Sequence, residues 1–185
     1  MDAVTAAFEL VPREGFLPLR ERRRATHDGP LPIGEGQTNS QPRTVEAMLR
    51  LLEVGPGHRV LDVGSGSGWT TALLAHLVGP EGQVLGVELE PSLVQFGTAN
   101  LAATHQPWAR IVAATPGVLG APDHAPYDRI LVSAQPTTLP QQLVDQLGDG
   151  GRLVIPVGGT MTLVTRNGDE VSESHHGSYR FVPLR

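Results

Sequence analysis

The chain has 185 residues, including 22 glycines, 16 prolines and no cysteine, and its formal net charge at pH 7 is −5. This length predicts a single domain that can bury its own core, and the absence of cysteine excludes disulfides, thiolate catalysis and cysteine-bound metal centres. All 14 basic residues are arginine, which excludes chemistry that needs a lysine amine. The negative net charge argues against a general nucleic-acid binder.

Residues 1–42 contain five prolines and no sustained periodicity, and they are predicted to be irregular. The first residues, Met1–Val4, carry an acid where a secretion signal needs positive charge. No apolar run approaches the roughly 20 residues of a membrane span. We therefore expect a cytoplasmic protein with no membrane contact.

From Pro42 onward, helices and strands are predicted to alternate. Apolar residues from Val45 to Leu52 recur with helical spacing, and Pro42 can begin that helix. The pattern then predicts strands at 59–63, 84–89, 110–114, 127–134 and 152–157, with helices at 69–78, 92–103 and 139–147. Short connections between such elements favour an α/β fold, with a mostly parallel sheet and helices on both faces.

The alternation of predicted strands and helices ends after Val157. The segment 161–166 and the stretch that ends at Leu184 are predicted to be antiparallel strands. Asn167-Gly168 lies between them and is a strong hairpin turn signal.

A glycine loop, Gly64-Ser65-Gly66-Ser67-Gly68, follows the strand that contains Asp62. In an open parallel sheet this turn lies at the carboxyl edge, where ligands bind, and glycines let the backbone approach a ligand closely. The third glycine comes one residue too early for the dinucleotide fingerprint, which disfavours an NAD-dependent oxidoreductase. Glu88 ends the next strand, 24 residues beyond Gly64, where a carboxylate can accept both hydroxyls of a ribose. Together these features predict a nucleotide-type ligand.

The D-x-G-x-G-x-G form of this loop resembles motif I of the class I S-adenosylmethionine (SAM) methyltransferases. Longer stretches resemble the protein-L-isoaspartate (D-aspartate) O-methyltransferases, in matching order along nearly the whole chain: Val11–Phe16, Pro30–Pro42, Ala125–Asp128, Gly150–Gly158 and Arg180–Leu184. The resemblance implies one Rossmann-like methyltransferase domain in three segments. These are a covering segment at 1–42, a SAM-binding core at 43–158 and antiparallel strands at 159–185.

The resemblance also implies a set of site residues. Ser40 falls on the family's active-site serine. The residues expected to bind SAM, and the product S-adenosylhomocysteine, are Thr38, Ser40, Asp62, Gly64, Ser65, Gly66, Gly68, Glu88, Leu89 and Thr115. The residues expected to bind the acceptor are Ile33, Asn39, Gln41 and Pro42. The spacing of the seven histidines matches no metal-binding motif, so no metal is expected.

The reaction implied by the resemblance is methyl transfer to the free carboxylate of L-isoaspartyl residues in damaged proteins or peptides, which begins their repair. A carboxylate with a reference pKa near 4 is already ionised at pH 7. Such a reaction needs no general base, metal or covalent nucleophile, and the enzyme must mainly align two reactants and exclude water. We expect a monomer with no nucleic-acid partner.

Three residues depart from the family pattern. Asn39 stands where the family usually has isoleucine, Thr26 where it has tyrosine, and Thr115 near the place of an acid. We expect Asn39 to alter the acceptor pocket and Thr115 to weaken SAM binding, because a hydroxyl bonds without the help of charge. These departures leave two alternatives open: a SAM-dependent carboxylate methyltransferase for an aspartate of a biosynthetic peptide or another acceptor, and a catalytically weak SAM-binding homologue.

Overall fold

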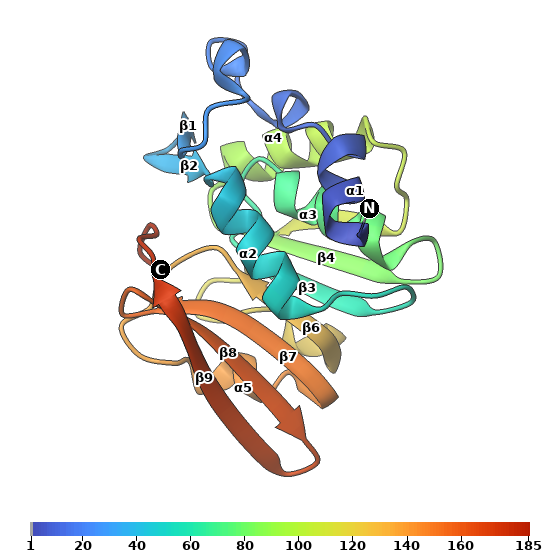
Figure 1. Cartoon of the computed structure of the whole chain (residues 1–185), viewed down its shortest axis with the longest axis vertical. Coiled ribbons are helices and arrows are strands. Elements are labelled where there is room, and N and C mark those ends of the chain that lie inside the picture. Colours follow the sequence, from blue (N-terminus) through green and yellow to red (C-terminus); the bar gives the residue numbers. More distant parts are fainter. Residues whose placement is uncertain (1) are drawn as a thin grey trace.

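A seven-stranded sheet forms the centre of the computed structural model, which describes residues 2–185 (Figure 1). The strand order is β5-β4-β3-β6-β7-β8-β9; the pairs from β5 to β7 are parallel, whereas β8 and β9 are antiparallel additions. The strands are β3 (Arg59–Val63), β4 (Gln83–Glu88), β5 (Ala109–Ala113), β6 (Tyr127–Val132), β7 (Leu147–Val157), β8 (Thr160–Asn167) and β9 (Glu170–Ser178). The predicted fold class, a mostly parallel sheet with antiparallel C-terminal strands, is confirmed.

The order of the strands creates a crevice beside β3. The chain runs outward from β3 to β4 and β5, and then returns to pair β6 with the other side of β3. The connections that leave the carboxyl ends of β3 and β6 therefore run in opposite directions, from β3 to β4 and from β6 to β7. Open α/β sheets bind their ligands at such a switch point.

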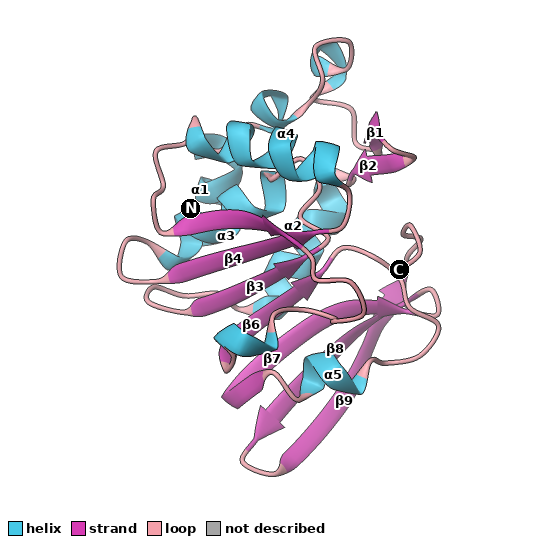
Figure 2. Ribbon diagram, turned by 180° about the vertical axis from the view of Figure 1, so that it is seen from behind, coloured by secondary structure: helices cyan, strands magenta, loops and turns pink. Residues whose placement is uncertain are grey.

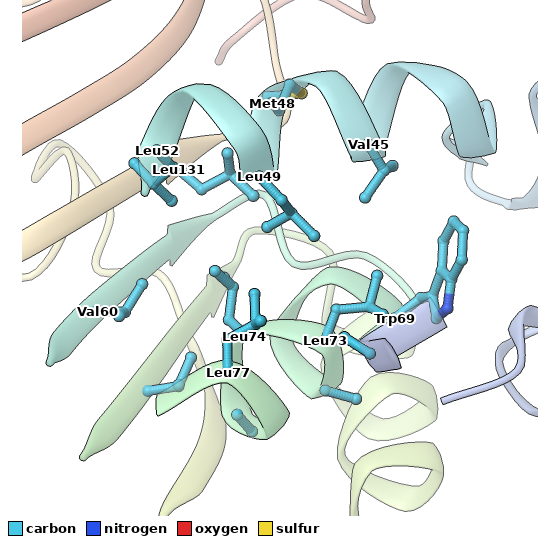
Figure 3. Close-up of a cluster of buried hydrophobic side chains, with 14 of the residues drawn as sticks. Val45, Met48, Leu49, Leu52, Val60, Trp69, Leu73, Leu74, Leu77 and Leu131 are labelled. Carbon is cyan, nitrogen blue, oxygen red and sulfur yellow. The ribbon is translucent and has the colours of Figure 1, made fainter. Parts of the chain in front are cut away.

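Four helices cover one face of the sheet: α1 (Ala3–Leu10), α2 (Pro42–Leu52), α3 (Trp69–Val78) and α4 (Pro91–Ala102). In α3 every residue except His76 is buried, because the helix lies between the sheet and the other helices. Figure 3 shows Leu49 of α2 and Leu74 of α3 pointing toward one another. These contacts form the larger core cluster.

The opposite face is covered more thinly, by the 3-10 turn Pro122–His124 and the short helix α5 (Gln141–Val144) (Figure 2). Helices on both faces are therefore confirmed, but the helix predicted at 139–147 is wrong in length. Leu147 pairs with Tyr127 as the first residue of β7. Leu143 and Val144 are fully buried under the strands, so one helical turn suffices to bury the apolar residues there.

The prediction that residues 1–42 are irregular is wrong in part. They contain α1, the 3-10 turns Arg13–Phe16 and Arg22–Arg24, and a small antiparallel hairpin of β1 (Leu31–Gly34) and β2 (Gln37–Asn39). We call β1 and β2 the covering hairpin. It is held by a satellite core in which Leu31 and Ile33 pack with Leu17 and with Leu93 of α4.

The last antiparallel strand ends at Ser178, earlier than predicted. Residues 179–185, the C-terminal tail, instead cross the carboxyl edge of the sheet. There Gln135 N donates to Val182 O (2.8 Å) and Leu184 N donates to Gln135 O (3.0 Å). Pro183 has no N–H with which to continue an antiparallel ladder. Within residues 2–185, none of the helices has the length and apolarity that crossing a membrane requires.

Candidate functional site

A cavity of about 850 Å³ lies at the carboxyl ends of β3, β4 and β6. The glycine loop forms its floor, and the covering hairpin forms one wall. The remaining walls come from the end of β4, the loops 114–120 and 133–138, and the C-terminal tail. The cavity thus joins segments from the two ends of the chain at the switch point between β3 and β6.

The three glycines of the loop serve different purposes. All have positive φ: 77° at Gly64, 52° at Gly66 and 87° at Gly68. Gly64 and Gly66 line the cavity, and a Cβ on Gly66 would lie 3.2 Å from Ile33 of the covering hairpin. Gly68 lies outside the lining, and a Cβ there would meet Gly97 O of α4 at 2.9 Å. Gly68 therefore allows the start of α3 to pack closely against α4, and it does not form part of the cavity wall.

Glu88 brings a carboxylate to the cavity at the end of β4. Its Oε2 accepts from Gly66 N (2.8 Å), and its Oε1 accepts from Leu89 N (2.7 Å) and Glu90 N (3.0 Å). These bonds fix the carboxylate and couple it to the glycine loop. A carboxylate has about four lone-pair sites, so acceptor capacity remains for a hydroxyl of a ligand.

Asp62 lies beneath the glycine loop and does not line the cavity. Its Oδ2 accepts from the hydroxyls of Thr70 (2.8 Å) and Thr71 (2.7 Å), which joins β3 to the start of α3, while Oδ1 has no partner. Complete burial raises the pKa of Asp62 to about 6, even though the two threonine hydroxyls act in the opposite direction. The structure gives this residue a place supporting the loop, where sequence analysis expected contact with the cofactor.

Thr38 and Ser40 lie on the covering-hairpin side of the cavity, and Leu89 and Thr115 also line it. Ser40 is half-buried and lies two residues before the start of α2. Thr38, Leu89 and Thr115 are exposed, so their side chains are available to a bound molecule. Ile33 completes this group of predicted residues in the lining.

The other residues predicted to bind the acceptor are placed differently. Asn39 touches the cavity but is 5% exposed, and its amide is bonded to Arg13 and Ser67. Gln41 and Pro42 lie outside the lining, because the chain turns away there into α2; Gln41 donates to Asp28 O (3.1 Å) and Pro42 begins the helix. Asn39 was expected to alter the acceptor pocket directly. In the structure its side chain instead helps to hold the covering hairpin against Arg13 and Ser67.

Two parts of the cavity wall were not predicted from the sequence: the loop after β6 and the C-terminal tail. Gln135, in the former, lines the cavity, and its Oε1 is buried without a hydrogen-bond partner. Ser65 Oγ is also buried without a hydrogen-bond partner. The sequence predicts β6 as a strand of the parallel sheet, and its pairing with β3 in the structure brings its carboxyl end to the same crevice.

The polar groups of the cavity suit a nucleoside that carries a positive charge. The charged side chains in the lining are Glu88 and Arg185, and Arg185 is paired with Glu90 at 2.6 Å. Ser65 Oγ and Gln135 Oε1 are buried and can accept from a ligand. A volume of about 850 Å³ lies at the upper end of the roughly 300–1,000 Å³ of small-molecule sites and leaves space for part of a second reactant.

Comparison with known proteins gives consistent results. Residues 1–185 match the family model described as Protein-L-isoaspartate(D-aspartate) O-methyltransferase. A protein of Methanopyrus kandleri named Protein-L-isoaspartate O-methyltransferase is 45% identical, over 98% of this chain and 82% of its own length. One of the same name from Aeropyrum pernix is also 45% identical, over 98% of this chain and 72% of its own length.

Two solved structures cover the whole chain with a TM-score of 0.89. One, from Plasmodium falciparum, is described as a putative protein-L-isoaspartate O-methyltransferase in complex with S-adenosyl-L-homocysteine; it is 27% identical, and 91% of it is covered. The other, described as a protein-L-isoaspartate O-methyltransferase, is 26% identical, and this chain spans 62% of its length.

Proposed function

Because the chain belongs to the protein-L-isoaspartate (D-aspartate) O-methyltransferase family, we propose that it methylates the free carboxylate of L-isoaspartyl residues in damaged proteins or peptides. It is a SAM-dependent carboxyl methyltransferase. The observation that carries this function is that the glycine loop, the Glu88 carboxylate, the covering hairpin and Ser40 all line one cavity. Such a cavity can hold a cofactor and an acceptor side by side.

SAM supplies a sulfonium methyl group for in-line displacement and leaves as S-adenosylhomocysteine. In our proposal, Glu88 accepts from the ribose hydroxyls, while Gly64, Ser65 and Gly66 let the backbone approach the cofactor. Leu89 and Thr115, which also line the cavity, would contact the cofactor, with Thr115 on the adenine side. The positive φ of the glycines and the fixed carboxylate of Glu88 support these roles.

The chain's own residues have to orient the acceptor and exclude water. The acceptor carboxylate is already ionised at neutral pH, so no proton has to be removed before transfer. Ser40 and Thr38 provide hydroxyls that can orient a carboxylate without neutralising it, and Gln135 provides an amide on the loop after β6. Positioning of this kind can lower a barrier by several kcal/mol.

The alternative acceptors considered from the sequence depended on a retuned pocket at Asn39 and Thr26. Both ends of the Asn39 amide are bonded within the protein, and Thr26 lies outside the lining. Neither residue therefore offers the cavity a new polar group. This favours the isoaspartyl acceptor over an aspartate of a dedicated peptide.

We also propose that the three segments 1–42, 43–158 and 159–185 work as one domain, in a cytoplasmic monomer that needs no nucleic acid. Support for a monomer comes from the exposed large apolar side chains among residues 2–185. Leu89 and Val118 line the cavity, and the other three lie on separate segments: Leu10, Leu19 and Val171. The net charge of −5 disfavours a nucleic-acid partner.

Two substitutions should separate cofactor binding from turnover. Glu88→Gln removes the charge and replaces one acceptor oxygen with an amide nitrogen, which donates and cannot accept, so we expect SAM affinity to fall at least about tenfold. Ser40→Ala should leave SAM affinity within about threefold but lower kcat for an isoaspartyl peptide about tenfold or more. Calorimetry gives the affinity, and transfer from labelled SAM gives kcat.

The control is Glu81→Gln, which removes the same charge at an exposed position outside the cavity. It should leave both quantities unchanged. Wild-type SAM affinity in Glu88→Gln would contradict the cofactor site. Equal losses of affinity and turnover in Ser40→Ala would make Ser40 a cofactor residue only.

A further inference from the structure

A chain of buried polar side chains joins the N-terminal segment to the glycine loop. Arg13 Nε donates to Asn39 Oδ1 (2.7 Å), and Asn39 Nδ2 donates to Ser67 Oγ (3.0 Å). The exposed fractions of Arg13, Asn39 and Ser67 are 5%, 5% and 2%. Hydrogen bonds shielded from water in this way are strong determinants of local geometry.

We propose that Asn39 is a positioning residue that holds Thr38 and Ser40 in place over the glycine loop by linking Arg13 to Ser67. This inference rests on the proposed function, since it assigns how the acceptor side of that site is built. Asn39 lies between the two hydroxyl residues in sequence, and all three contribute to the lining, but the Asn39 side chain is bonded to Arg13 and Ser67. Any displacement of Asn39 must therefore move both neighbours.

The amide of asparagine suits this position because it accepts and donates at the same time. Arg13 needs an acceptor, and the amide nitrogen supplies a donor for the Ser67 hydroxyl. The isoleucine that the family resemblance leads us to expect at this position could do neither. We call the linked side chains of Arg13, Asn39 and Ser67 the polar clamp. It takes the place of the apolar contact that isoleucine would make.

Both ends of the clamp are fixed independently. Besides its bonds to Asn39 O (3.0 Å) and Ser40 O (2.9 Å), Arg13 donates to His27 O (2.9 Å) and Gly29 O (2.9 Å), and these last two bonds hold it independently of Asn39. At the other end, Asn100 of α4 donates to Ser67 O (2.9 Å). The clamp therefore fixes where Ser40 lies relative to α4 and the glycine loop.

The tip of the covering hairpin is tied to the same helix. Ser92 in the first turn of α4 donates to Glu35 Oε1 (2.9 Å). That contact is exposed and lies at the turn, whereas the clamp is buried and lies beside Ser40. We therefore assign the placement of Ser40 to the clamp.

The test compares Asn39→Leu, whose side chain has the same branched skeleton but is bulkier and forms no hydrogen bonds, with Asn39→Asp. The carboxylate of Asn39→Asp can accept from Arg13, and the Ser67 hydroxyl can turn to donate to it. At a temperature where all variants are folded, Asn39→Leu should lower kcat for an isoaspartyl peptide about tenfold and change the SAM dissociation constant less than about threefold. Asn39→Asp should retain most of the activity.

Ser67→Ala breaks the same link from the other side. It should lower kcat by a similar factor, and the double variant Asn39→Leu/Ser67→Ala should be no worse than Asn39→Leu alone, because coupled residues are not additive. Asn167→Leu is the control, since Asn167 is exposed at the end of β8. It should behave as wild type.

Wild-type kcat in Asn39→Leu, with only a lower melting temperature, would overturn the proposal, and so would an equal loss in Asn39→Asp. If the wild type itself fails to methylate the peptide, the proposed function fails, and the clamp is judged by amide hydrogen exchange of residues 37–41. Faster exchange in Asn39→Leu than in the wild type would support the clamp. Unchanged exchange would overturn it.

Discussion

Arg13 is the residue that most clearly organises the N-terminal segment. Arg13 is 5% exposed, and its guanidinium donates to the carbonyl oxygens of His27, Gly29, Asn39 and Ser40 at 2.9–3.0 Å. Desolvation lowers the pKa of Arg13 to about 10, which still leaves it charged at pH 7. Arginine suits this task, because its five N–H donors can bind several oxygens at once.

Asp62 is expected to make stability depend on pH. Its folded-state pKa of about 6 lies above the ordinary value of 3.8, so folding favours the protonated form. This contribution is fully present below about pH 4 and is lost as pH rises through 6. Between pH 4 and 7 the unfolding free energy of the wild type should fall by on the order of 2–3 kcal/mol relative to Asp62→Asn.

Urea unfolding of both proteins at several pH values measures this difference. The side-chain oxygen of Asp62→Asn can still accept from Thr70 and Thr71, and other titrating groups cancel because both proteins share them. Hydrogen bonds lower the pKa of Asp28, for example, which acts with the opposite sign in both proteins. A difference that does not vary with pH would contradict the assignment of a raised pKa to Asp62.

At the scale of elements, the glycine loop and α4 fit together backbone to backbone. A Cβ on Gly97 of α4 would lie 2.7 Å from Gly66 O, and one on Gly68 would lie 2.9 Å from Gly97 O. Gly97 lies outside the cavity lining. The close approach of α4 nevertheless sets where the loop stands.

Gly97→Ala should therefore destabilise the protein by about 1–3 kcal/mol and also weaken SAM binding. The extra methyl meets a backbone atom that cannot rotate away. Thermal unfolding and calorimetry measure the two effects. In Gly15→Ala the added Cβ has nothing within 4 Å, so this control should bind SAM as the wild type does; a Gly97→Ala variant with unchanged SAM affinity would show that the loop does not depend on α4.

The elements best predicted from the sequence were those with strong local patterns. Strand β3 and helix α3 have the predicted bounds, because an apolar run leads into the glycine loop and a long apolar segment follows it. The covering hairpin was missed, since its strands have four and three residues. Leu31 and Ile33 find their partners at Leu17 and Leu93, which lie outside any local pattern.

At the scale of the whole molecule, the topology explains why part of the site could be predicted. Parallel strands around a switch point bring Gly64, Gly66 and Glu88 to one edge whatever the loops do. The residues that close the cavity depend on tertiary contacts. The pairing of Gln135 with the C-terminal tail and the inward turn of Asn39 have no signal in residue type or spacing.

The measurement that tests the function most directly is methyl transfer from labelled SAM to two peptides that differ only in one residue, L-isoaspartyl or aspartyl. We predict label on the isoaspartyl peptide alone, because the cavity must align a main-chain-derived carboxylate with the cofactor. Equal labelling of both peptides, or no labelling of either while SAM still binds, would contradict isoaspartyl methylation as the function of this cavity.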